Sequence, residues 1–189
     1  MAAQFMDQDD FYASPQVPTG VANCLREAAA VYADTATAEP LLWQAQALAP
    51  DCLTVYFALY KFYFYKGQLG DAEHVTRLGL ETAARLGGVD ADWSRLTPAS
   101  GTDWQKSDSP QHFYLFTLKA LAFIRLRLGE SENSLAILNK LAELDPMDSV
   151  GASVIRALAG TCSAVPAGAS RRTASGGISV RWMPITKPI

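Results

Sequence analysis

Apolar side chains recur at intervals of three and four positions along most of this chain, the spacing of one face of an α-helix. The first such stretch begins at Thr19 and runs to a turn at residues 34–37. Thr37 is a candidate cap for the next stretch, which carries Pro40 in its first turn and stops at Pro50. The pattern therefore predicts two helices joined by a short turn.

The pattern predicts a second pair of helices, again joined by a short turn. The stretch from Leu53 to Lys66 is rich in aromatic residues, and residues 67–71 form a glycine-containing turn. The pattern then predicts a returning helix from Ala72 to Leu86, ended by two consecutive glycines.

A third pair runs from about Gln111 to Leu128, turns at Gly129 and continues to Leu144. One more amphipathic stretch follows, for which Asp148 or Ser149 is the expected cap and in which Val150 is expected to be helical. Its partner helix is missing. This last stretch therefore has the position of a capping helix that covers the final apolar face of an array.

Three segments break the helical pattern. Residues 1–18 are acidic, aromatic and proline-containing, and are expected to form a flexible, extended arm. Residues 87–110 form an irregular insertion, part of which should pack because it holds two tryptophans. Residues 166–189 are rich in Pro, Gly, Ser, Ala and Arg and are expected to be a disordered basic tail. The helical domain is then 19–165.

Composition and charge narrow the class of protein. The net charge is −3, and the tail supplies four basic residues and no acid, so the remaining residues carry a charge of −7. Such an acidic body is poorly suited to nucleic acid. No apolar run reaches the roughly 18 residues of a membrane span, and from the acidic, non-basic start we expect no secretory signal. With three scattered cysteines, we expect a cytoplasmic protein with reduced, buried thiols.

The spacing of these signals resembles the tetratricopeptide repeat (TPR) family over residues 19 to about 160, because helix, turn, helix and closing proline recur over about 34 residues. In the second unit, which begins at Leu53, the matching positions are Tyr56, Leu59, Tyr63, Gly67 and Ala72. In the third they are Leu118, Leu121, Ala122, Gly129, Leu138 and Pro146, and in the first they are Leu25, Ala38, Leu42, Ala45 and Pro50. The chain departs from the family at Arg26, Tyr60, Thr76 and Arg125. The resemblance implies an all-α, right-handed solenoid of about three helix hairpins plus a C-terminal capping helix.

In the TPR family the first helix of each pair lines a concave groove, and the resemblance assigns residues of this chain to it. The assigned residues are Asn23, Glu27, Phe57, Lys61, Phe64, Tyr65, Phe116, Lys119, Phe123, Leu126 and Arg127. They form an aromatic surface with three basic groups on an otherwise acidic body. We expect this groove to bind a peptide or helix of a partner protein with apolar anchors and at least one carboxylate, as an adaptor or chaperone does.

Other interpretations remain open from the sequence. Aromatic residues at helical spacing are usually core, so Phe57, Phe64 and Phe123 are also candidates for the interior. The arm segment from Asp7 to Tyr12 has a composition that suits the groove, in its own chain or in a neighbour. The chain can also be a structural module that self-associates as a homodimer and has no separate client.

Two further resemblances bear on the partner. Small acidic three-unit proteins of this kind serve as chaperones of type III secretion translocators in bacteria. The aromatic run from Val55 to Tyr65 also resembles small TPR proteins encoded beside nitrogen-fixation genes, which implies a helper in metalloenzyme maturation.

Motifs for catalysis and metal binding are absent from the sequence. The two histidines, His74 and His112, are far from each other, and the cysteines lack metal-ligand spacing. No phosphate-binding loop, dinucleotide fingerprint or nucleophile elbow occurs. We therefore expect neither an enzyme nor a cofactor, and the expected partner is another protein rather than nucleic acid or membrane.

Overall fold

The periodic apolar pattern folds into helices in the computed structural model, which describes residues 17–101 and 104–163, with side chains to residue 160. The helices are α3 (Thr19–Ala30), α4 (Thr35–Leu48), α5 (Leu53–Tyr65), α6 (Leu69–Gly87), α7 (Pro110–Arg127), α8 (Ser131–Leu144) and α9 (Ala152–Ser163). These described residues contain no strand, so the expected all-α class is confirmed.

The start of α4 differs from the sequence prediction. Asp34, not Thr37, is its N-cap, and the Asp34 carboxylate accepts a hydrogen bond from the Ala36 N–H at 3.1 Å. Because an ionised carboxylate also interacts favourably with the positive end of the helix, it is a strong competitor for this position. The helix therefore begins at Thr35, and Pro40 lies in its second turn rather than its first.

The last helix begins later than predicted. Val150 is buried but lies before α9, which starts at Ala152. Asp148 has a left-handed backbone (φ +52°) that interrupts the helical path, and its carboxylate accepts from the Ser153 N–H at 3.2 Å. Asp148 thus caps α9 from a tighter turn than the sequence suggested.

Two helix pairs are closed by the same turn. Gly67 (φ +76°) and Gly129 (φ +83°) adopt the left-handed conformation that glycine tolerates at a helix end. The following residue bonds back to the helix in both turns, from the Gln68 N–H to the Tyr63 carbonyl at 2.9 Å and from the Glu130 N–H to the Arg125 carbonyl at 2.9 Å. The α3–α4 turn has no glycine and lacks this motif.

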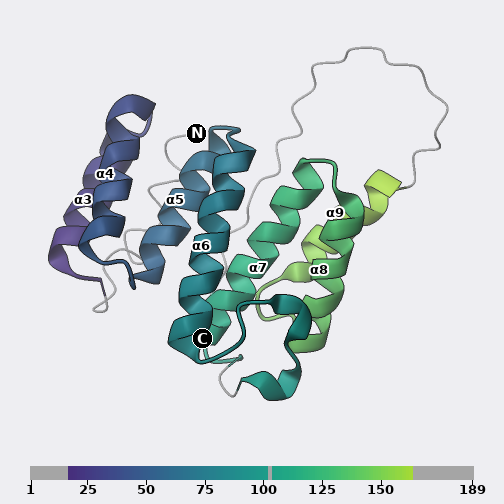
Figure 1. The fold of residues 1–189 in the computed structure, drawn as a ribbon. Coiled ribbons are helices and arrows are strands. Elements are labelled where there is room, and N and C mark those ends of the chain that lie inside the picture. The colour runs from purple at the N-terminus through teal and green to yellow at the C-terminus, as the bar shows by residue number, and fades with distance from the viewer. Residues whose placement is uncertain (1–16, 102–103, 164–189) are drawn as a thin grey trace, which may run out of the picture.

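Consecutive helices pack against each other from α3 to α9, and every second helix also makes contact from α3 through α5 and α7 to α9. Figure 1 shows the result as a row of helix pairs, from α3 and α4 at one end to α8 and α9 at the other. The helices α3, α5, α7 and α9 therefore form one layer, and α4, α6 and α8 cover it. In the layer of odd-numbered helices, α5 and α7 are direct neighbours.

The apolar core has two parts. One is built by α3, α4, α5 and the start of α6, and the other by the end of α6 together with α7, α8 and α9. Phe64 packs against both parts, and Ile124 of α7 reaches into the first. The two parts therefore share the α5–α7 contact.

A close approach of α5 and α6 depends on Gly79. A Cβ atom at this position would lie 3.1 Å from the Tyr56 Cβ and 3.6 Å from the Thr117 Cγ2. The contact places α6 against both α5 and α7. No sequence signal used above had marked this glycine.

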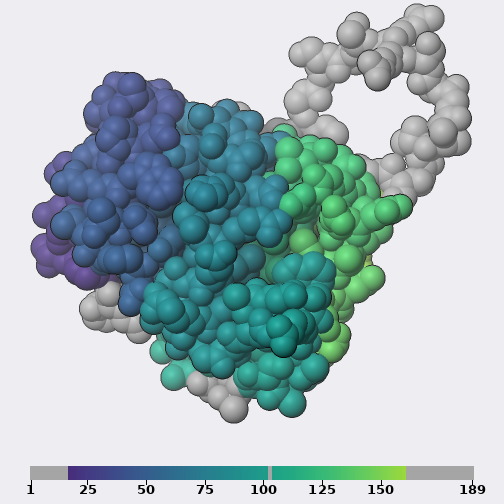
Figure 2. Space-filling view, in the orientation of Figure 1, coloured from purple at the N-terminus to yellow at the C-terminus, as the bar shows by residue number. Residues whose placement is uncertain are grey.

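The irregular segment between α6 and α7 packs as its tryptophans predicted. Leu96 and Trp104 are buried, and the Trp104 ring meets the Tyr114 ring edge-on at 6.5 Å. The His112 ring bonds to the Trp104 carbonyl at 2.9 Å, and the Lys140 ammonium donates to the Leu96 carbonyl at 3.0 Å. In Figure 2 this teal segment lies across the lower end of the molecule.

Several sequence expectations fall outside the described residues, among them the N-terminal arm up to residue 16, residues 102–103 and the tail 166–189. Cys24 is buried and Cys52 half-buried, and both are free thiols. Across residues 17–101 and 104–163, the helices are all too short or too polar to cross a lipid bilayer.

Candidate partner-binding face

Aromatic rings from α5 and α7 meet in two matched pairs. The ring centroids of Phe57 and Phe116 lie 5.2 Å apart, and those of Phe64 and Phe123 lie 5.1 Å apart. The two phenylalanines of α5 are seven positions apart, and so are the two phenylalanines of α7. The two helices therefore run in parallel and turn these faces toward each other. Tyr60 links the pairs from within α5, at 5.7 Å from Phe57 and 6.5 Å from Phe64.

Three cations lie over these rings. The Lys61 Nζ is 4.9 Å from the Phe57 centroid and 6.0 Å from that of Tyr65. The Lys119 Nζ is 4.5 Å from the Phe116 centroid, and the Arg127 Cζ is 5.6 Å from that of Phe64. We call this group of α5 and α7 residues the aromatic–basic face: Phe57, Tyr60, Lys61, Phe64, Tyr65, Phe116, Lys119, Phe123 and Arg127.

The face is only partly open to solvent. Tyr65 is 44% exposed and Arg127 is exposed, whereas Lys61, Phe64 and Phe116 are half-buried. Phe57 and Phe123 are buried, at 8% and 7% exposure, because each lies against a ring of the neighbouring helix. The two phenylalanines therefore serve as the floor of the face rather than as projecting anchors.

Lys119 differs from the expectation of a cation offered to a partner. It is 4% exposed, and its ammonium donates a hydrogen bond to the Val150 carbonyl, which lies between α8 and α9. Burial lowers the pKa of Lys119 to about 8. The sequence register assigned Lys119 and Phe116 to the same face, and they are in contact, but the position of the segment around Val150 depends on tertiary packing.

Lys61 is the most unusual charged group of the face. Within the described part of the chain it makes no hydrogen bond and no ion pair, and its ammonium lies near the Phe57 and Tyr65 rings. Burial lowers its pKa to about 8. Burial likewise raises the pKa of the neighbouring Tyr60 phenol, which stays protonated at neutral pH.

Asn23 and Glu27 of α3 stand apart from this group. Both are exposed; Asn23 accepts a hydrogen bond from Arg26, and Glu27 lies in a shallow hollow between α3 and α4 with Val31 and Leu41. Neither makes a ring contact or ion pair with the aromatic–basic face. The α5 and α7 residues are thus brought together as the sequence register predicted, and the α3 residues are not.

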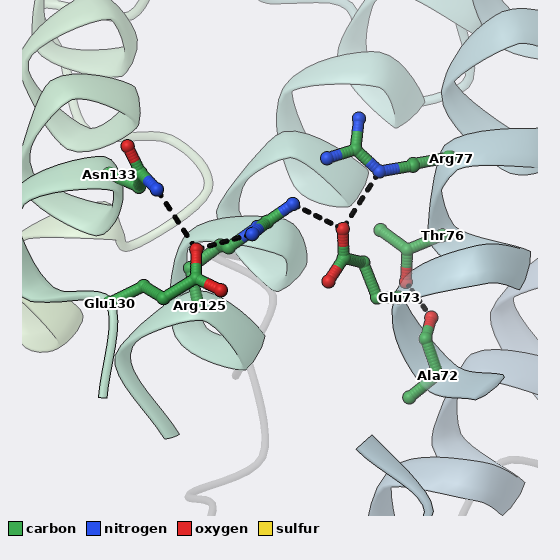
Figure 3. A network of polar contacts seen from close by, with 7 residues as sticks. All are labelled: Ala72, Glu73, Thr76, Arg77, Arg125, Glu130 and Asn133. Carbon is green, nitrogen blue, oxygen red and sulfur yellow. Dashed lines mark hydrogen bonds and ion pairs between the residues drawn. The ribbon is translucent and has the colours of Figure 1, made fainter. Parts of the chain in front are cut away.

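Arg125, a departure from the TPR pattern, has a structural role that the sequence did not reveal. Figure 3 shows its guanidinium between Glu73 of α6 and Glu130 at the start of α8. Arg77 also reaches Glu73, at 2.9 Å, and Asn133 donates to Glu130 at 2.9 Å. Arg125 and Glu73 are 19% and 18% exposed. The network therefore links α6, α7 and the start of α8.

Together these observations define an all-α protein of successive helix pairs, with a desolvated cation and aromatic rings on its odd-numbered helices. No family model and no solved structure matches the chain. It is 36% identical over 129 residues to an "uncharacterized 19.8 kDa protein in nifW 5′region" of Azotobacter chroococcum mcd 1, covering 68% of this chain and 72% of that protein. The chain therefore belongs to the family of this Azotobacter protein.

Proposed function

We propose that this chain is a TPR-like α-solenoid that acts as an adaptor or chaperone by binding one partner protein through the aromatic–basic face. The matching glycine turns after α5 and α7 support the repeat interpretation, because two helix pairs then share one closing geometry. The contacts from α3 through α5 and α7 to α9 also fit stacked pairs, in which the first helices share one face.

The observation that carries the binding role is Lys61. A lysine held against two aromatic rings without an acidic partner among the described residues has lost water without gaining a carboxylate. A carboxylate supplied by another segment would offset that desolvation, so the site favours an acidic group. The rings around it favour an apolar neighbour of that group.

Typical interaction energies fit a partner that supplies an apolar side chain to the rings and an acidic group to Lys61. Burying one apolar anchor side chain contributes roughly 1.5–3 kcal/mol. An exposed ion pair contributes about 0–1 kcal/mol, and a partly desolvated one contributes more when its geometry is good. The expected partner segment thus has one or two aromatic or aliphatic anchors beside an Asp, a Glu or a chain-terminal carboxylate.

Affinity capture from the native cell tests this proposal with matched variants of the full chain. The face variant is Lys61→Glu with Arg127→Glu, and the control is Arg95→Glu with Lys106→Glu, which makes the same charge change at exposed residues of the irregular segment. Quantitative mass spectrometry should show one protein recovered at least tenfold less with the face variant and unchanged with the control. Equal recovery with both variants would overturn the binding role of the face.

A self-associating helical module makes the opposite prediction. Light scattering during size-exclusion chromatography of the full chain would then give a dimer mass that the face variant reduces to a monomer. A monomer for the wild-type chain would exclude the homodimer and leave the adaptor role.

A second candidate function comes from the relative. Because that protein is named for its place in the nifW 5′ region, a role in nitrogen fixation, such as help in metalloenzyme maturation, is a candidate for this chain too. The test is to delete the relative's gene in Azotobacter chroococcum and to supply this chain in its place. Slow growth on dinitrogen but normal growth on ammonium, restored by the wild type and not by the face variant, would support this function. Equal growth of the deletion strain on both nitrogen sources would contradict it.

A further inference from the structure

The aromatic–basic face has an excess of positive charge that the described helices do not neutralise. Lys61 and Arg127 have no hydrogen-bonded or ion-paired acid within the described part of the chain, although the chain as a whole is acidic. Glu73 of α6 and Glu130, the residue before α8, are both paired with Arg125 rather than with the face. The face therefore suits an acidic segment that also carries aromatic side chains.

One segment of this chain has that composition. Residues 5–12 read Phe-Met-Asp-Gln-Asp-Asp-Phe-Tyr, with three carboxylates and three aromatic rings in eight positions. The other end of the chain does not compete, because residues 166–189 hold four basic residues and no acid. Charge alone thus selects the N-terminal arm over the tail.

The arm also begins at the correct end of the face. Gly20, at the start of α3, lies near Leu48 at the end of α4, and α5 starts only a few residues later at Leu53. The chain therefore enters α3 beside the start of α5. Val17, which precedes α3, packs on the core formed by these helices.

The length of the arm is sufficient. Lys61 is eight residues along α5 from Leu53, about 12 Å at 1.5 Å per residue. One or two helix spacings of about 8–10 Å complete the distance from Val17. An extended chain covers about 3.3 Å per residue, so Tyr12 reaches about 17 Å from Val17 and Asp7 about 33 Å. The arm can therefore place its rings beside Phe57 and its carboxylates beside Lys61 and Arg127.

We propose that residues 5–12 occupy the aromatic–basic face of their own chain and act as an autoinhibitory segment that a partner must displace. This inference rests on the proposed binding role of the face. A short tether keeps the segment at a local concentration of the order of millimolar, so even a weak contact of about 0.1 mM would reduce the apparent affinity of a partner about tenfold. The arm would thereby protect the rings from non-specific association until the correct partner arrives.

Photo-crosslinking locates the arm in the full-length protein. A benzophenone amino acid replaces Phe11, and the same group replaces Ser175 in the tail as a control. Mixing unlabelled and ¹⁵N-labelled protein before irradiation distinguishes contacts within one chain from contacts between chains. We expect crosslinks from position 11 to peptides of α5 and α7 within a single chain, and at least fivefold fewer in the Lys61→Glu, Arg127→Glu variant. Crosslinks between chains, to other helices only, or at equal yield in the variant would overturn the inference.

A competition experiment separates the arm from the binding role of the face. The probe is a fluorescent peptide of residues 3–14, and the proteins are the full-length wild type and an Asp7→Asn, Asp9→Asn, Asp10→Asn variant. We expect the probe to bind the arm variant about tenfold more tightly than the wild type, and to lose that binding when Lys61→Glu is added. If it binds both equally and still depends on Lys61, the face binds peptides but the arm is not its occupant. If position 11 crosslinks within the chain while the probe binds neither protein, self-occupancy holds and the adaptor role loses its support.

Discussion

At the scale of single residues, Lys61 sets the behaviour of the aromatic–basic face. A lysine that folding removes from water prefers its neutral form, and burial lowers the pKa of Lys61 from 10.5 to about 8. Its ammonium is therefore charged at neutral pH and costs free energy unless a carboxylate approaches. Attraction for an acidic segment should weaken as the pH rises through about 8.

The first prediction concerns the pH dependence of stability when the arm cannot supply a carboxylate. In the Asp7→Asn, Asp9→Asn, Asp10→Asn variant, the unfolded chain binds more protons than the folded one between pH 8 and 10.5, because the folded pKa of Lys61 and of Lys119 is about 8. The free energy of unfolding should therefore rise between pH 7.5 and 9.5, by about 1–3 kcal/mol, and urea denaturation at each pH measures it. This increase in stability should end near pH 10. Burial raises the pKa values of Tyr60 and Tyr114, so the unfolded chain loses these protons at a lower pH and unfolding is favoured.

The matched control removes the titrating group. Adding Lys61→Met to the same variant should raise stability at pH 7 and reduce the increase with pH to the part that belongs to Lys119. Lys106→Met, at an exposed lysine, should change neither value. An unchanged pH profile after Lys61→Met would show that Lys61 is not desolvated.

At the scale of helices, close contact between α5 and α6 depends on one glycine. Gly79→Ala places a methyl group 3.1 Å from the Tyr56 Cβ, which cannot rotate away because it is fixed to the α5 backbone. Overpacking of this kind costs about 1–3 kcal/mol and exceeds the gain of about 1 kcal/mol in helix propensity. We expect a net loss of about 1 kcal/mol in urea unfolding. Gly70→Ala on the same helix meets nothing within 4 Å and should stabilise instead.

Ion pairs of Arg125 link α7 to Glu73 of α6 and to Glu130 at the start of α8. Arg125→Met leaves Glu73 and Glu130 without their common cation, and solvent screens Glu73 poorly because its side chain is only 18% exposed. We expect a loss of about 1–3 kcal/mol in the free energy of unfolding, measured by urea denaturation. Arg85→Met removes a pair with Asp51 in which both side chains are more than half exposed and should have no measurable effect. Equal effects of the two substitutions would contradict the assigned role of Arg125.

The sequence predicted helices better than it predicted their contacts. The apolar periodicity and the Gly, Pro and turn residues between helices located the start of α3 at Thr19, the start of α5 at Leu53 and the end of α8 at Leu144. Register also predicted that Phe57 and Phe64 would share a face with α7. It could not reveal that Lys119 reaches the Val150 carbonyl, because that contact depends on how the chain returns between α8 and α9.

The same limit explains the errors at helix starts. A choice between Asp34 and Thr37 as the cap of α4 depends on which side chain the folded turn directs toward the free N–H groups. The late start of α9 depends on the left-handed backbone of Asp148, a conformation that only a few per cent of non-glycine residues adopt. Arg125 could have been suspected, since a charge at an expected aromatic position needs a partner.

At the scale of the whole molecule, the stacking of helix pairs predicts uneven stability along the chain. The α3–α4 pair lies at one end of the row and contacts the rest chiefly through α5, whereas α7 contacts α5, α6, α8 and α9. Stacked pairs open from their ends, because each pair is held only by its neighbours. A single globular core would instead protect all its helices to a similar extent.

Hydrogen exchange followed by mass spectrometry tests this last prediction at neutral pH. We expect amides of α3 and α4 to exchange at least tenfold faster than those of α7, which lies in the middle of the row and is largely buried. The Trp43 indole donates to the Tyr63 hydroxyl at 2.8 Å, and that hydroxyl donates to Glu39 at 2.6 Å, so this chain of bonds links α4 to α5. Trp43→Phe should therefore accelerate exchange in α3 and α4 alone. Tyr114→Phe removes a bond to the Ala91 carbonyl and should affect only the irregular segment and its neighbours. Equal protection of α3, α4 and α7 in the wild-type chain would show that the helix pairs open as one unit and would argue against a solenoid.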